Sequence, residues 1–265
     1  MRGIWKKIGW GICIVAILLM LVEVALLISI LHGCKNILLE EEVMTSGDFI
    51  YRVNGDRLFL EGLSEQGKQK ETIVIPKEID GYTVDHYTYL YGLGYRGNFE
   101  SEKLKQIYII PNVSMYRVEN SLAPNLSKIV LIGIDNGIGN TARISESINL
   151  YFCSTKRYAE KANELGCLNT IYYNEWLSNC NYFYNYEGAE NDGYYWSDNY
   201  DYGEKITYVP QNPKREGYIF GGWFQEPECI NIWIFDRDTL PEVKYNEEGE
   251  ALYQETRLYA KWYLQ

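Results

Sequence analysis

Histidine is nearly absent from this 265-residue chain, which contains only His32 and His86. A metal site built mainly from histidine is therefore excluded, and a Ser–His–Asp triad would need one of these two residues. No recognisable nucleophile motif surrounds His86. We therefore expect no catalytic residue, no metal and no cofactor, and we expect the protein not to be an enzyme.

Basic residues are also scarce, with 25 Lys and Arg against 36 Asp and Glu and a formal net charge of −11. Nucleic-acid binding is disfavoured, because it needs a basic footprint on the phosphates. The charge is uneven along the chain. Residues 1–35 carry +3, so the remainder carries −14. We expect that remainder to prefer neutral or basic partners.

Six cysteines are present, and none of their spacings matches a zinc-binding signature. Cys153, Cys167, Cys180 and Cys229 follow the first third of the chain. A disulfide between Cys153 and Cys167 would tie the end of a predicted strand to the helix-like region after it. Buried thiols are the alternative.

One long apolar run stands out near the N-terminus. Residues 8–31 contain a single charge, Glu23, and no proline, which is enough for a helix of roughly 36 Å across a ~30 Å hydrocarbon core. Basic residues before the run and acidic residues after it place the N-terminus in the cytoplasm. We predict a cytoplasmic tail and uncleaved signal anchor over 1–35, followed by a linker over 36–47. The membrane is thus an expected partner, in a single pass.

Two details leave alternatives open in this segment. Leu31-His-Gly-Cys34 is similar to a bacterial lipobox, in which Cys34 would be lipidated after cleavage. Glu23 either pairs with a partner helix or is a tolerated single carboxyl.

Short β-branched runs recur through the middle of the chain. They are too short to be stable strands alone, whereas stacking them side by side would bury a continuous core. The last four start about 20–22 residues apart, as in a repeat array. The runs are Thr72–Pro76, Gln106–Pro111, Lys128–Gly133, Ile148–Phe152 and Thr170–Tyr173.

Residues 48–176 resemble the BspA-like leucine-rich repeats of bacterial surface proteins. The motifs that carry the resemblance are Ile75-Pro76, Ile79–Val84, Leu104–Ile107 and Leu126–Ile129. This resemblance implies a short solenoid of class α/β, mostly β, closed by a strand and a helix.

The composition changes after Trp176, and residues 181–265 hold 13 of the 25 tyrosines. Aromatic runs broken by Gly, Asn and Pro favour a small antiparallel sheet with hairpins. The order and spacing of several residues resemble the Listeria–Bacteroides repeat, the B-repeat of internalin-type surface proteins. The residues that we assign to this structural motif are Gly217, Tyr218, Phe220, Gly222, Trp223, Tyr259 and Trp262.

This second resemblance implies a compact, β-rich, β-grasp-like domain over 181–265. It also implies a role as a spacer or adhesion module of bacterial surface proteins.

The best candidate for ligand binding is an aromatic cluster interleaved with acids. Tyrosine and tryptophan offer a large contact area at low entropic cost and stack on sugars or protein surfaces. The alternative is that some of these rings fill the core of the small domain. The cluster consists of Tyr194, Tyr195, Trp196, Tyr200 and Tyr202.

The sequence as a whole predicts an N-terminal transmembrane helix, a short leucine-rich-repeat solenoid and a small C-terminal β-rich domain. We expect a bacterial cell-membrane protein whose C-terminal part is extracellular and acts by non-catalytic adhesion to a protein or glycan. A structural stalk, or a subunit of an envelope complex, is the alternative. A carbohydrate hydrolase would need acids that converge in a pocket, which the sequence does not show.

Overall fold

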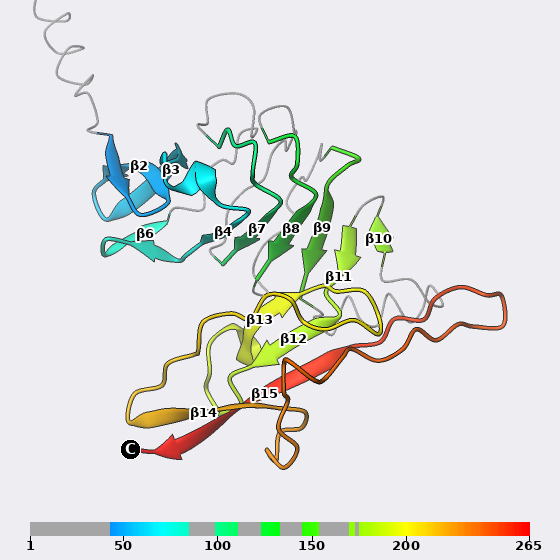
Figure 1. Cartoon of the computed structure of the whole chain (residues 1–265). Coiled ribbons are helices and arrows are strands. Elements are labelled where there is room, and N and C mark those ends of the chain that lie inside the picture. Colours follow the sequence, from blue (N-terminus) through cyan, green and yellow to red (C-terminus); the bar gives the residue numbers. More distant parts are fainter. Residues whose placement is uncertain (1–42, 85–98, 111–122, 133–144, 154–169, 173–174) are drawn as a thin grey trace, which may run out of the picture. The chain divides into compact units, whose positions relative to one another are not determined.

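The structure, a computed structural model, describes residues 43–84, 99–110, 123–132, 145–153, 170–172 and 175–265 (Figure 1). These residues form three β-sheets, together with two short 3₁₀ turns, η1 (Gly67–Gln69) and η3 (Asn191–Gly193).

The first sheet is built from tight hairpins within residues 44–84. A two-residue loop joins its two longest strands and begins with Gly55 at φ +67°. Glycine in the first loop position is typical of type II′ hairpins, because that position needs a positive φ. The strand order is β1 (Met44–Ser46), β2 (Phe49–Asn54), β3 (Arg57–Leu63), β6 (Tyr82–Val84) and β5 (Glu78–Ile79).

The second sheet, here called the repeat sheet, contains the β-branched runs stacked side by side. Neighbouring strands β4, β7, β8, β9 and β11 are parallel, and β10 pairs antiparallel with β11. The assignment of these stacked strands to the leucine-rich-repeat family stays a prediction. The strands are β4 (Thr72–Ile75), β7 (Gln106–Ile109), β8 (Lys128–Leu131), β9 (Asn149–Phe152), β11 (Glu175–Leu177) and β10 (Thr170–Tyr172).

Both faces of the central repeat strands are buried. Because successive side chains of a strand point to opposite faces, Ile107 and Ile109 enter one core while Tyr108 enters another. Ile129 and Val130 divide between the two cores in the same way. We call the face that carries Tyr108 and Val130 the outer face. Burial on both sides explains why these runs are almost continuously apolar.

The third sheet, here called the terminal sheet, supplies the partner of the outer face. Its two central strands, β12 (Cys180–Phe183) and β15 (Thr256–Leu264), run parallel, with β13 (Tyr194–Asp198) beside β12 and β14 (Tyr218–Phe224) beside β15. Tyr182, Trp196 and Leu258 share a core with Tyr108 and Val130. Val43–Gln265 accordingly form one compact unit.

The predicted fold class is wrong. The described residues form strands and 3₁₀ turns only, so this part of the chain is all-β rather than partly helical. The apolar runs within the described ranges are short and buried on both faces, which suits strands rather than helices. The C-terminal region folds into β-strands, as predicted.

The predicted membrane helix has no support in the structure. Over the ranges that the structure describes, no helix is long and apolar enough to cross a bilayer. Residues 8–31, together with Glu23 and Cys34, lie outside those ranges.

Gly67 and Gly221 give a matched test of packing. A Cβ at Gly67 would lie 2.3 Å from the backbone oxygen of Asp48, which the amide of Ser64 holds at 2.8 Å. A Cβ at Gly221 would lie 2.4 Å from the ring of Tyr263, whose half-exposed side chain is free to rotate away. We expect Gly67→Ala to destabilise the full chain by about 1–3 kcal/mol. Gly221→Ala should cost about 0.5 kcal/mol or less. Urea unfolding measures both, and equal losses would contradict this packing.

Candidate functional site

The candidate site lies where the outer face of the repeat sheet meets the terminal sheet. Parallel register aligns the first residues of four repeat strands, Thr72, Gln106, Lys128 and Asn149. Two residues further along each strand, the side chains on the same face are apolar or aromatic. The outer face therefore has a polar row beside an apolar row.

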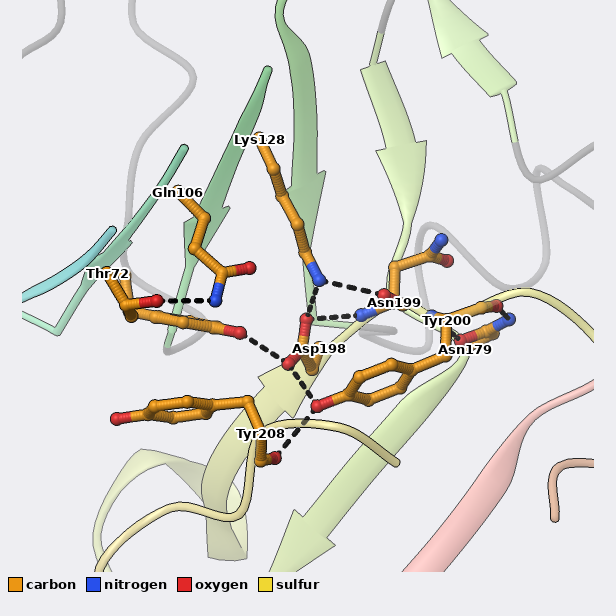
Figure 2. A network of polar contacts seen from close by, with 9 residues as sticks. Thr72, Gln106, Lys128, Asn179, Asp198, Asn199, Tyr200 and Tyr208 are labelled. Atoms are coloured by element: carbon orange, nitrogen blue, oxygen red, sulfur yellow. Dashed lines mark hydrogen bonds and ion pairs between the residues drawn. The ribbon is translucent and has the colours of Figure 1, made fainter. Parts of the chain in front are cut away.

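Asp198, at the end of β13, connects the two sheets. Its side chain is fully buried, and it forms an ion pair with Lys128 at the start of β8. The hydroxyl of Tyr108 donates to Asp198 Oδ2 at 2.6 Å, and the amide of Asn199 donates to Oδ1 at 2.7 Å. Figure 2 shows Lys128, Asn199 and Tyr200 reaching the carboxylate of Asp198. These donors compensate the carboxylate for the loss of water around its charge.

Tyr200 completes the network around Asp198. Its hydroxyl lies 2.5 Å from Asp198 Oδ2 and 2.8 Å from the carbonyl oxygen of Tyr208, so its single proton is held between two acceptors (Figure 2). The Lys128 ammonium lies 4.9 Å above the ring of Tyr200 and donates to the carbonyl oxygen of Asn199 at 2.8 Å. The lysine is thus fixed by an ion pair, a hydrogen bond and a cation–π contact.

The tyrosines of the site are poor acids. Burial, reinforced by the charge of Asp198, raises the pKa of Tyr108 and of Tyr200 far above the ordinary value. Burial, with Asp201 and Asp198 nearby, raises the pKa of Tyr151 from 10 to about 12. All three hydroxyls therefore stay protonated at neutral pH and act as hydrogen-bond donors or acceptors rather than as nucleophiles.

These shifts predict a loss of stability at alkaline pH. Below pH 10 the folded and unfolded chains both keep their tyrosine protons, so the full stability is present. Above pH 10 the unfolded chain releases protons that the folded chain retains, and stability falls as pH rises through the folded pKa values. We expect tyrosinate absorbance to appear in two phases, the second coinciding with unfolding seen by circular dichroism. A single phase that is complete before unfolding would contradict the burial of these rings.

Beside the network is a cavity of about 620 Å³, here called the junction pocket. One wall comes from β8 and β9, and the other comes from the segment after β13, with Thr239 from the segment after β14. Its lining is mixed in charge and rich in hydrogen-bonding groups. The lining residues are Lys128, Tyr151, Asn199, Tyr200, Asp201, Glu204, Lys205, Thr207 and Thr239.

The aromatic cluster predicted to bind ligand is split by the structure. Trp196 and Tyr200 are buried in the core shared by the two sheets, so they offer almost no surface. Tyr194, Tyr195 and Tyr202 are half-buried. Of the five, only Tyr200 lines the junction pocket. Ligand binding by the half-buried members stays a prediction.

The residues of the predicted repeat motif occupy structural positions. Gly217 and Gly222 have φ values of +73° and +108°, which only glycine adopts easily. Trp223 is buried and packs edge-on against Tyr182, with ring centroids 4.9 Å apart. Phe220 packs against both Trp223 and Trp262.

Two other motif residues lie on the faces of the terminal sheet. Tyr218 packs under the guanidinium of Arg215 at 3.7 Å, and Tyr259 stacks on Phe183 at 5.2 Å.

The cysteine predictions fall largely outside the described residues. Cys153 is buried, whereas Cys167 and Cys34 lie in ranges that the structure leaves undescribed, so both the disulfide and the lipidation stay predictions. Within the described ranges, no three His, Cys, Asp or Glu side chains gather closely enough to hold a metal ion.

The sequence did not indicate that Asp198, Lys128 and Tyr108 contact one another. One local signal existed, because Lys128 is the only charged residue of the otherwise apolar strand β8. Nothing local marks its partner, which lies 70 residues further along the chain.

Comparison with known proteins supports the reading of the C-terminal region. Residues 183–261 match the family model of the Listeria-Bacteroides repeat domain. No curated protein and no solved structure matched the chain. A Listeria-Bacteroides repeat domain is typical of surface or adhesion-type proteins, and this chain carries one.

Proposed function

We propose that this protein is exposed on the surface of a bacterial cell and binds an extracellular protein or glycan without transforming it. The observation that carries the proposal is the match of residues 183–261 to a repeat domain typical of surface or adhesion-type proteins. The net charge of −11 also makes nucleic acid an unsuitable partner.

The structure limits where such a partner would bind. In a repeat array the sheet face is an obvious binding surface. Here Tyr108, Val130 and Ile132 on that face are buried in the core shared with the terminal sheet. We therefore expect a partner to bind at surfaces around the terminal sheet and its junction with the repeats, rather than at the middle of the outer face.

The test of this function is a binding screen with the full chain on glycan and protein arrays. We expect reproducible capture of a neutral or basic partner, and no change in the mass of the captured molecule. Failure to capture any partner would reject the binding function, and release of a cleaved product would reject the non-catalytic assignment.

The position of the protein on the cell surface is tested separately, by protease treatment of intact bacteria that produce it. A surface position predicts that residues 43–265 become accessible to the protease without lysis. Complete protection before lysis, followed by cleavage after lysis, would contradict a surface position.

A structural stalk, or a subunit of an envelope complex, is the second candidate. Exposed apolar side chains at the β14–β15 edge favour it, because such groups commonly mark protein contacts. Ile219 and Tyr263 are directly paired there, and each is about half exposed. Stable co-purification with other envelope proteins that is lost in Ile219→Asp, without any array binding, would favour this candidate.

A further inference from the structure

The junction pocket lies outside the family motif residues and has the features of a small-molecule subsite. Its volume of about 620 Å³ is within the range of ligand sites in proteins. One wall comes from the repeat sheet and the other from segments that follow β13 and β14, and the network around Asp198 links the repeat sheet to the end of β13. The pocket is therefore preformed rather than assembled by the ligand.

The charges of the pocket argue against an anionic ligand. Lys128 is neutralised by Asp198, and Lys205 donates to the carbonyl oxygen of Asp236. The carboxylates of Asp201 and Glu204 are exposed at the pocket and would repel an anion. Lys205 offsets only one of these two carboxylates, so the pocket keeps a net negative charge. An uncharged ligand avoids the repulsion that an anion would meet.

The hydrogen-bonding groups of the pocket suit a polyhydroxylated ligand. Carboxylates accept, ammonium groups donate, and the hydroxyls of Thr207 and Thr239 and the amide of Asn199 do both. Each hydroxyl of a sugar is likewise both donor and acceptor. The half-buried ring of Tyr151 provides an apolar surface beside these groups.

The polar row of the outer face extends this arrangement beyond the pocket. Gln106 donates to Thr72 Oγ1 at 2.7 Å, and Trp176 Nε1 donates to Asn149 at 3.2 Å. All four side chains are partly exposed. Since neighbouring strands lie about 4.8 Å apart, these groups form a regularly spaced polar track on both sides of Lys128. A linear ligand could follow that track.

We propose that the junction pocket binds an uncharged oligosaccharide, with the polar row of the repeat sheet accommodating the units that extend from it. This inference rests on the proposed binding function and names its ligand class and place. Tyr151 provides the stacking surface, while Asp201, Glu204 and Thr207 accept or exchange hydrogen bonds with the sugar hydroxyls.

The test uses the full chain and three uncharged tetrasaccharides, maltotetraose, cellotetraose and N-acetylchitotetraose, measured by titration calorimetry. We expect at least one to bind. Asp201→Asn combined with Thr207→Val should weaken that binding at least tenfold, because a charged acceptor and a hydroxyl are lost while the shape is kept. The matched control, Asp56→Asn combined with Thr83→Val, changes exposed residues of the first sheet and should alter affinity less than twofold.

The outcomes separate this inference from the proposed function. Tetrasaccharide binding that is equal in both double variants would overturn the pocket assignment. Capture of only charged glycans or of proteins on the arrays, with no tetrasaccharide binding, would overturn the ligand class and leave the proposed function standing. If neither assay finds a partner, both proposals fail. Circular dichroism of each variant checks that a loss of binding is not a loss of folding.

Discussion

Replacing Asp198 by alanine is expected to lower the free energy of unfolding of the full chain by about 3–5 kcal/mol. The substitution leaves Lys128, only 18% exposed, without its counter-charge. It also removes the acceptor of the Tyr108 hydroxyl and one of the two acceptors near the Tyr200 hydroxyl. Breaking a buried pair from one side is costly because the remaining charge stays desolvated.

Urea unfolding followed by tryptophan fluorescence measures this loss. Glu248→Ala is the matched control, because Glu248 is an exposed acid in the same terminal region. It should change stability by no more than about 0.5 kcal/mol. A loss below about 1 kcal/mol for Asp198→Ala would mean that the carboxylate is solvated and does not join the two sheets.

Replacing Val130 by aspartate is expected to cost about 4 kcal/mol or more, because it places an unpaired carboxylate in a closed core. Val130 is fully buried between the repeat sheet and the terminal sheet. Val209→Asp is the same chemical change at a valine that is 45% exposed, and it should be tolerated within about 0.5 kcal/mol.

Thermal and urea unfolding of the two valine variants give the comparison. If the outer face of the repeat sheet were open to solvent, Val130→Asp would behave like Val209→Asp. Equal stability of the two variants would therefore contradict the placement of the terminal sheet on the repeats.

The repeat strands could be predicted from the sequence because each one is marked by a local run of β-branched residues. Four runs of β-branched residues at similar intervals predict stacked strands, and β7, β8 and β9 form where those runs occur. The hairpin after β2 also had a local signal in Gly55-Asp56, which is typical of a two-residue turn between strands. The five-stranded sheet built on it was not predicted, because its pairing of β3 with β6 joins segments far apart in sequence.

The candidate site was harder to predict from the sequence because it depends on long-range packing. Tyr108 and Asp198 are 90 residues apart, and no spacing rule connects them. The aromatic cluster shows the same limitation. Composition suggests that Trp196 and Tyr200 bind ligand, yet both are buried in the core that the terminal sheet shares with the outer face of the repeats.

A double-mutant cycle between Lys128 and Asp198 tests most directly whether the two sheets are joined at this site. The full chain, Lys128→Met, Asp198→Ala and the double variant are compared by urea unfolding. The structure predicts that the double variant is more stable than the sum of the single losses implies, with a coupling energy of about 1–3 kcal/mol. Losses that add within about 0.5 kcal/mol would contradict the buried pair and, with it, the junction of the repeat sheet and the terminal sheet.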